Sequence, residues 1–241
     1  VGTSGATNGS SDTYVAWCWK ESVTAGMDIV KFTGNQTART ISHSLSAKPE
    51  WLWIKNREKV ESYHMQHGGA GADNTQESNT NGAFGGGSTI WNDTEPTTSV
   101  FSVGNNGNIN ETGSDIVVWL WAGKQGYSKF GTYTGNGNAD GPFIHLGFKP
   151  AFLMYKSRDA VKSWYINDNK RDPHNPCDGV MLMDASDAEN ASHGNKIDFL
   201  SNGFKSRSTG STVNSSGAVY VYMAFSESPF VNSKGVPTNA R

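Results

Sequence analysis

Short apolar runs alternate with clusters of Gly, Asn, Pro and Asp along the whole chain. Runs of this kind, about four to eight residues long, are typical of β-strands joined by turns. Residues 14–19 and 219–225 are apolar on both alternating faces, which favours strands in the middle of a sandwich or beneath a neighbouring unit. The pattern predicts an all-β fold made of tandem antiparallel β-sandwich units, lectin-like or jelly-roll-like.

Two segments depart from this pattern. Residues 186–193 contain an Asp-Ala-Glu stretch and are expected to form one or two helical turns, with Asp184, Asp187 and Glu189 at a solvated helix start. Residues 68–88 are very poor in large apolar side chains, so we expect a long mobile loop there.

The chain repeats itself with a period of about 100 residues. Phe32-Thr33-Gly34-Asn35 recurs as Tyr133-Thr134-Gly135-Asn136, and each copy continues to a proline, Pro49 or Pro150, that precedes an apolar run. A later signature, Asn110 to Trp121, recurs from Asn214 to Phe225. Several motifs in the same order favour a true tandem repeat over chance similarity.

The closing signature also appears at the start, where Asn8, Val15, Trp17 and Trp19 match Asn110, Val117, Trp119 and Trp121. We therefore expect residues 1–20 to be closing strands of a preceding, truncated repeat. Residues 21–124 and 125–230 are then two β-sandwich repeats, and residues 231–241 a C-terminal tail. The chain would be the C-terminal part of a longer protein. Alternatively, the first strand is a swapped element that completes a later sheet.

Composition gives no reason to expect a nucleic acid or an inserted membrane as partner. The net charge is −2, from 20 basic and 22 acidic residues. No apolar run is long enough to span a bilayer. Cys18 and Cys177 lack the spacing of a zinc site, and we interpret both as free thiols, although a pairing stays open.

Catalytic motifs are not evident, and no enzymatic activity is expected. His64 and His67 are interpreted as exposed loop histidines, and His174 beside Cys177 lacks a residue to orient it. The matched residues His43 and His145 are expected to bond their turns, although a repeated ligand contact is the alternative. The basic pairs Lys55/Arg57 and Lys156/Arg158 suggest a solvated strand edge.

The densest polar cluster is the loop 164–178, which the first repeat lacks. Aromatic rings beside acidic and basic groups suit a sugar, which stacks on a ring while polar groups take its hydroxyls. Oxygen ligands there could also hold Ca²⁺, the one cofactor considered. The alternative is a polar loop pinned by prolines, with its tryptophan in the core. The candidate sugar-binding residues are Trp164, Asp168, Arg171, His174 and Asp178.

Six Asn-x-Ser/Thr sequons, at Asn8, Asn35, Asn92, Asn110, Asn190 and Asn214, could carry glycans in a secreted eukaryotic protein. Several of them fall on the repeat signature, so we interpret them as turn residues.

Several motifs of the second repeat resemble a repeat domain of tail-fibre-like virion proteins of marine, cyanophage-type bacteriophages. They are YSKFGTYTGNG at 127–137, GPF at 141–143, GFKPAF at 147–152, DFLSNGF at 198–204 and AFSESPF at 224–230, and the ending Asn239-Ala240-Arg241 is similar too. The resemblance covers nearly the whole chain. The first repeat departs from it after Arg57, where a Gly-rich loop replaces the expected strands.

The resemblance implies a non-enzymatic structural protein on the virion surface, in the C-terminal part of a tail fibre or appendage that contacts a host glycan. It also implies self-association, by analogy as a homotrimer, and contact with other virion proteins. Capsid decoration without host binding is the alternative, and a glycan-degrading tailspike is a third possibility, which would need paired carboxylates along one groove.

Overall fold

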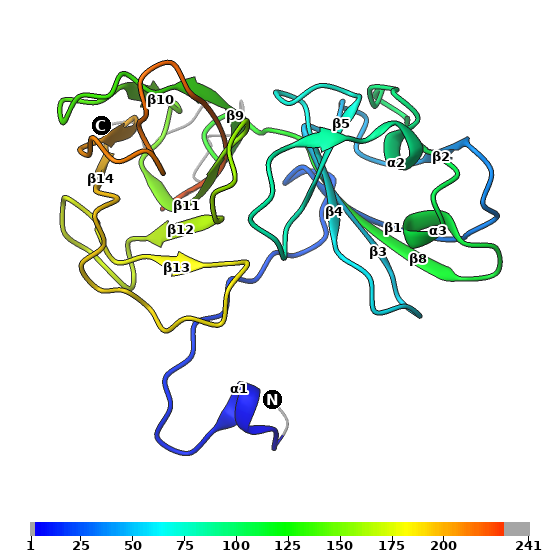
Figure 1. Cartoon of the computed structure of the whole chain (residues 1–241), viewed down its shortest axis with the longest axis horizontal. Helices are drawn as coiled ribbons and strands as arrows, with labels where there is room; N and C mark the ends of the chain where they lie inside the picture. The colour runs from blue at the N-terminus through cyan, green and yellow to red at the C-terminus, as the bar shows by residue number, and fades with distance from the viewer. Residues whose placement is uncertain (1–2, 229–241) are drawn as a thin grey trace.

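The computed structural model describes residues 3–228 and shows two β-rich units side by side (Figure 1). Nearly all regular structure is antiparallel β-sheet, so the predicted all-β class is confirmed. Short helical turns are the exception, and they are α1 (Gly5–Asn8), α2 (Ser88–Trp91) and α3 (Gly107–Asn110).

The first unit is built on a six-stranded sheet ordered β1-β8-β3-β4-β5-β6. Its strands are β1 (Met27–Thr33), β8 (Asp115–Trp121), β3 (Trp51–Asn56), β4 (His64–His67), β5 (Asn74–Glu77) and β6 (Gly85–Gly86). A two-stranded sheet of β2 (Arg39–Ser42) and β7 (Val100–Val103) closes a core with one face of it.

The second unit repeats this plan with a five-stranded sheet and a three-stranded sheet. The larger has the order β13 (Met181–Leu182), β12 (Tyr165–Asp168), β11 (Pro150–Ser157), β16 (Val219–Ser226) and β9 (Ser128–Thr134). The smaller has the order β10 (Phe143–His145), β15 (Gly203–Ser206) and β14 (Ile197–Leu200).

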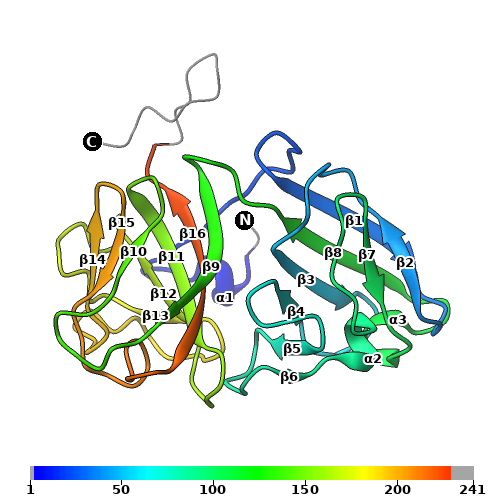
Figure 2. The same ribbon diagram turned by 90° about the horizontal axis from the view of Figure 1, so that it is seen from above.

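Each large sheet is apolar on both faces because its central strands carry apolar side chains at successive positions. One face of β8 sends Val118 and Leu120 into the core of the first unit, while the other sends Trp119 and Trp121 toward the second unit. A third core of Trp, Phe and Met side chains therefore lies between the two large sheets. The two large sheets thus face each other (Figure 2), and their side chains share one apolar core.

Hydrogen bonds to backbone carbonyls reinforce this contact at the loop before β6. The amide of Phe84 donates to Arg158 O at 2.9 Å, and Lys156 Nζ donates to Asn81 O at 3.0 Å. Phe84 also packs edge-on against Trp164, with ring centroids 6.0 Å apart. The segment expected to be a mobile loop therefore contains β5 and β6 and helps to cover the second unit.

The repeat motifs have a structural explanation. Asn110 and Asn214 are fully buried, and the Nδ2 of each donates to carbonyls of the surrounding turns, including Gly104 O for Asn110 and Ser208 O for Asn214. A Cβ on Gly34 would lie on Glu111 O, and one on Gly135 on Ser215 O. The recurring Gly and Asn thus hold equivalent turns, which agrees with their interpretation as turn residues.

The strand expected at residues 14–19 is wrong. This segment is extended and alternates in exposure, with Val15, Trp17 and Trp19 half-buried, but it belongs to no sheet. Upstream of it lies α1, which stands apart from both units (Figure 1). The sequence match to β8 and β16 is nevertheless informative, because α1 precedes this segment along the chain as α3 precedes β8 in the first unit.

Several other expectations also need correction. Residues 186–193 form no helix. His64 and His67 are buried in β4, which occupies the place of β12, instead of lying exposed in a loop. Lys55 and Lys156 lie on β3 and β11, which are interior strands, and Lys156 is fully buried, so these positions are no solvated edge.

Candidate functional site

Three in-register rows of side chains cross β1, β8 and β3 on the face toward the second unit. The first row, Met27, Trp121 and Trp51, is buried between the units, and the second, Ile29, Trp119 and Trp53, is only half-buried. The third row is Lys31, Val117 and Lys55. The face therefore grades from a dry aromatic core to an open aromatic surface and then to a basic end.

The open part of this face is the floor of a groove of about 500 Å³. The side chains of Trp19, Trp53, Trp119 and Trp121 line it, together with Met183 from the second unit. Tyr63 lies over the floor with its ring 6.2 Å from Trp119 and is 41% exposed. We call this cavity the tryptophan groove.

The equivalent positions in the second unit show that the repeat does not require an open groove. There the second row is Phe130, Met223 and Met154, and all three are buried. Trp164, which like Tyr63 directly precedes a strand, is fully buried beneath Phe84. The first unit thus covers the second row of the second unit, whereas the second unit packs against the first row of the first unit and leaves its second row half-buried.

The groove combines aromatic ring faces with a polar rim. Flat indole and phenol rings offer apolar faces for stacking, and polar groups at the rim can take hydroxyls. Asn79 is exposed at that rim, where its Oδ1 accepts from the Tyr63 amide at 3.2 Å. This hydrogen bond fixes the backbone that carries the Tyr63 ring.

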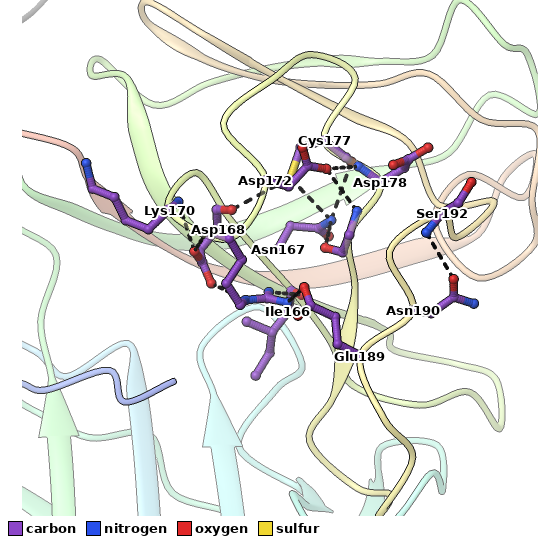
Figure 3. Close-up of polar contacts among 12 residues, drawn as sticks. Ile166, Asn167, Asp168, Lys170, Asp172, Cys177, Asp178, Glu189, Asn190 and Ser192 are labelled. Atoms are coloured by element: carbon purple, nitrogen blue, oxygen red, sulfur yellow. Dashed lines mark hydrogen bonds and ion pairs between the residues drawn. The ribbon is translucent and has the colours of Figure 1, made fainter. Parts of the chain in front are cut away.

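The loop predicted to bind sugar has a different structure (Figure 3). Trp164 is 0% exposed, so it offers no face to a ligand, and the core alternative holds for this residue. Asp168 is buried and paired with Arg171, whose Nε lies 2.6 Å from Asp168 Oδ2. The backbone amides of Lys170 and Arg171 also donate to this carboxylate.

Electrostatics confirm that Asp168 is committed to its own loop. Burial raises its pKa, but the hydrogen bonds from Arg171 outweigh that effect and leave the pKa below the ordinary value. Trp17 Nε1 donates to Asp168 Oδ2 at 3.2 Å, which ties the N-terminal segment to the same carboxylate. Asp168 and Arg171 therefore anchor structure and have few free atoms for a sugar.

The remaining candidates, His174 and Asp178, do not join them. His174 is exposed and lines a small polar cavity with Lys149, Lys170 and Glu227, whereas Arg171 borders a separate cavity beside Glu189. The amide of Asp178 donates to Asp172 Oδ2 at 2.7 Å (Figure 3). The five predicted residues thus do not line one surface.

The carboxylates of Asp172 and Asp184 and the thiol of Cys177 are also engaged within the protein. Asp172 accepts amides from its own loop, and Asp184 accepts the Trp164 amide at 2.8 Å. Burial raises the pKa of the Cys177 thiol to about 12, which keeps it protonated and unreactive at neutral pH. Both cysteines are free, Cys18 exposed and Cys177 buried.

The matched histidines differ between the units. His43 bonds its turn as expected, since its Nε2 lies 3.2 Å from Thr97 O and its Nδ1 accepts from the Leu45 amide. His145 is exposed and lies against Phe143, with ring centroids 6.4 Å apart.

Metal and membrane features are not evident in the described part of the chain. Residues 3–228 contain no group of three or more His, Cys, Asp or Glu side chains placed to hold a metal ion. The carboxylates considered for Ca²⁺ face Arg171 and backbone amides instead. Within the same residues, no helix has the length and apolar character needed to cross a membrane.

Comparison with known proteins places the chain in a family. A domain of unknown function, DUF7483, matches residues 1–229. The chain belongs to the DUF7483 family. No curated protein and no solved structure matches it. The function of this DUF7483 domain must therefore be argued from its own surface.

Sequence reasoning missed the groove although its signal was present. The pairs Trp51/Trp53 and Trp119/Trp121 have the two-residue spacing that puts both rings of a pair on one face of a strand. The second unit has smaller or more flexible residues at most of these positions, such as Met154 and Met223. That excess of tryptophan in one copy of a repeat was the available sign.

Proposed function

We propose that this DUF7483 domain is a non-enzymatic glycan-binding module and that the tryptophan groove is its binding site. The observation that carries the proposal is the contrast between the two units. The same sheet face is sealed by protein in the second unit and left open, lined with tryptophan, in the first. Leaving large aromatic surface in water costs stability, about 25 cal/mol per Å², so an open aromatic face favours a binding role.

The biological setting we propose follows the resemblance to tail-fibre-like virion proteins. The domain would form part of an appendage on the particle surface and contact a glycan on the host cell. Capsid decoration differs from this in needing no ligand, and a tailspike differs in cleaving one. Binding without loss of glycan length supports the proposal against both.

Glycan binding by the whole chain tests the proposal. On an array of bacterial envelope glycans, we expect the wild type to bind and Trp119→Ala to lose roughly tenfold or more in affinity, as expected when a central aromatic contact is removed. Trp53→Ala should behave similarly. Phe143→Ala is the matched control, because Phe143 is 45% exposed but lies on β10, on the other sheet of the second unit.

Folding of each variant is checked by near-ultraviolet circular dichroism and thermal unfolding, and Trp119→Phe keeps an apolar ring if the alanine variant unfolds. A wild-type chain that binds no glycan on the array would overturn the proposal. So would equal binding by folded Trp119→Ala and Phe143→Ala variants.

A further inference from the structure

The tryptophan groove continues into a second cavity that carries positive charge. The two cavities share Ile29, Tyr63 and Trp119, so they form one continuous surface. The second is also lined by Lys31, Lys55, Arg57 and Val117. Within the described residues, the linings of both cavities include three cationic side chains and no carboxylate.

The state of each cation decides what it can do. Lys55 Nζ donates to Lys59 O and Glu61 O, both at 2.7 Å, and lies 5.7 Å from the centre of the Tyr63 ring. It is therefore held in place with one N–H left over, since an ammonium has three. Arg57 lies 3.6 Å from Asp115, and both side chains are exposed, so this ion pair is weak.

Lys31 is the least committed of the three. It is exposed at the end of the third row, and within the described part of the chain its ammonium has no hydrogen bond or ion pair. Lys31 and Lys55 stand on either side of Val117 on neighbouring strands, and all three line the second cavity. An anionic group placed over Val117 would therefore meet two cations directly beside an apolar stacking surface.

The equivalent row of the second unit shows what happens when this end is covered by protein. There Lys156 donates to Lys162 O and also to Asn81 O of the first unit, and burial lowers its pKa to about 8. Thr132 stands at the position of Lys31. Lys31 is thus particular to the open groove and is not required by the repeated fold.

From these contacts we infer that the groove takes an acidic glycan, with sugar rings stacked on Trp53 and Trp119 and a carboxylate or sulfate held at Lys31 and Lys55. This inference rests on the proposed function and names its ligand class. The three rows span about 14 Å along β8, from Trp121 to Val117, at a rise of about 3.4 Å per residue. A groove of that length fits an oligosaccharide with its acidic unit at the basic end.

Charge complementarity favours this occupant over a second copy of the chain. The protein carries a net charge of −2, but the second cavity is lined by three cations, so an acidic glycan gains attraction at that end of the site. A loop from another copy would have to desolvate Lys31 and pair it, as Asn81 does for Lys156. A second copy is therefore an outcome of the test.

The test uses the whole chain and a set of acidic bacterial capsule fragments, each with its carboxyl-reduced form. We expect the acidic forms to bind about tenfold or more tightly than the reduced ones, and only their binding should weaken as salt is raised. Lys31→Gln should reduce binding of the acidic forms roughly fivefold and leave the reduced forms unchanged. Lys31→Arg should restore it.

The matched control is Lys196→Gln, an exposed lysine outside the groove. Equal affinity for acidic and reduced fragments, with no effect of Lys31→Gln, would overturn the acidic-ligand inference but leave the proposed function standing. Absence of binding to every fragment would overturn both. Dimerisation in sedimentation analysis that Lys31→Gln or Trp119→Ala abolishes would assign the groove to a second copy and overturn the inference.

Discussion

His67 connects a single buried side chain to the pH dependence of stability. It is 1% exposed on β4, and its Nδ1 accepts the Gly69 amide at 2.9 Å, which requires the unprotonated nitrogen. Trp51 lies edge-on against the ring, with centroids 5.1 Å apart. Packing against the aromatic core therefore buries this imidazole and keeps it neutral.

Burial lowers the pKa of His67 from 6.5 to about 4. The unfolded chain binds this proton more readily, so stability is complete above pH 6.5 and is lost as the pH falls toward 4, by about 3 kcal/mol. Burial also lowers the pKa of His64, which acts in the same direction.

The prediction is tested with His67→Asn, which keeps an acceptor for the Gly69 amide but cannot titrate. Urea unfolding between pH 7 and pH 4 should show a smaller loss of stability in the variant than in the wild type. Carboxylates that titrate in the same range are common to both proteins and cancel in the difference. Identical pH profiles would contradict the assigned pKa.

Residue patterns indicated the strand content well because alternation and turn residues are local signals. They misplaced His64, His67 and Lys156 because burial of these residues depends on a second sheet or unit that local pattern does not show. The same reason explains Trp164 of the candidate sugar-binding loop. Trp164 to Asp178 has the right composition, but Trp164 is covered by Phe84 from the other unit. Composition alone does not show which candidate residues are covered by another part of the chain.

At the scale of elements, the segment 13–21 is the clearest contrast between pattern and outcome. Its sequence matches β8 and β16, each of which lies between two partner strands. Among residues 3–228, no hydrogen bond between backbone groups involves residues 13–21, and contacts are made by side chains such as Trp17 and Trp19. Strand propensity reflects packing against neighbours, so a matching sequence without neighbours stays extended and unpaired.

Amide hydrogen exchange tests this description. We expect the amides of residues 13–21 to exchange quickly, whereas those of β8 and β16 are protected by two neighbouring strands. β9, an edge strand with one partner, is the internal control and should fall between them. Slow exchange across residues 13–21 would show that the segment is paired in solution and would contradict its place here.

At the scale of the whole molecule, the two units are not independent domains. They share a core that contains Trp51, Phe130 and Trp164. The Trp51 ring centroid lies about 6 Å from those of the other two. One unit seals the other's face, so a chain of two units offers one tryptophan groove. Multivalency, if the particle uses it, has to come from several copies of the chain rather than from the repeat within it.

The central claim is that the tryptophan groove binds a glycan, and an NMR titration of the indole N–H signals tests it most directly. With the tightest-binding glycan from the array, we expect the signals of Trp53 and Trp119 to shift until binding is saturated. Those of Trp91 and Trp164, both 0% exposed and outside the groove, should stay in place. Shifts confined to amides of residues 170–178, with Trp53 and Trp119 unmoved, would contradict the claim and return the site to the polar loop.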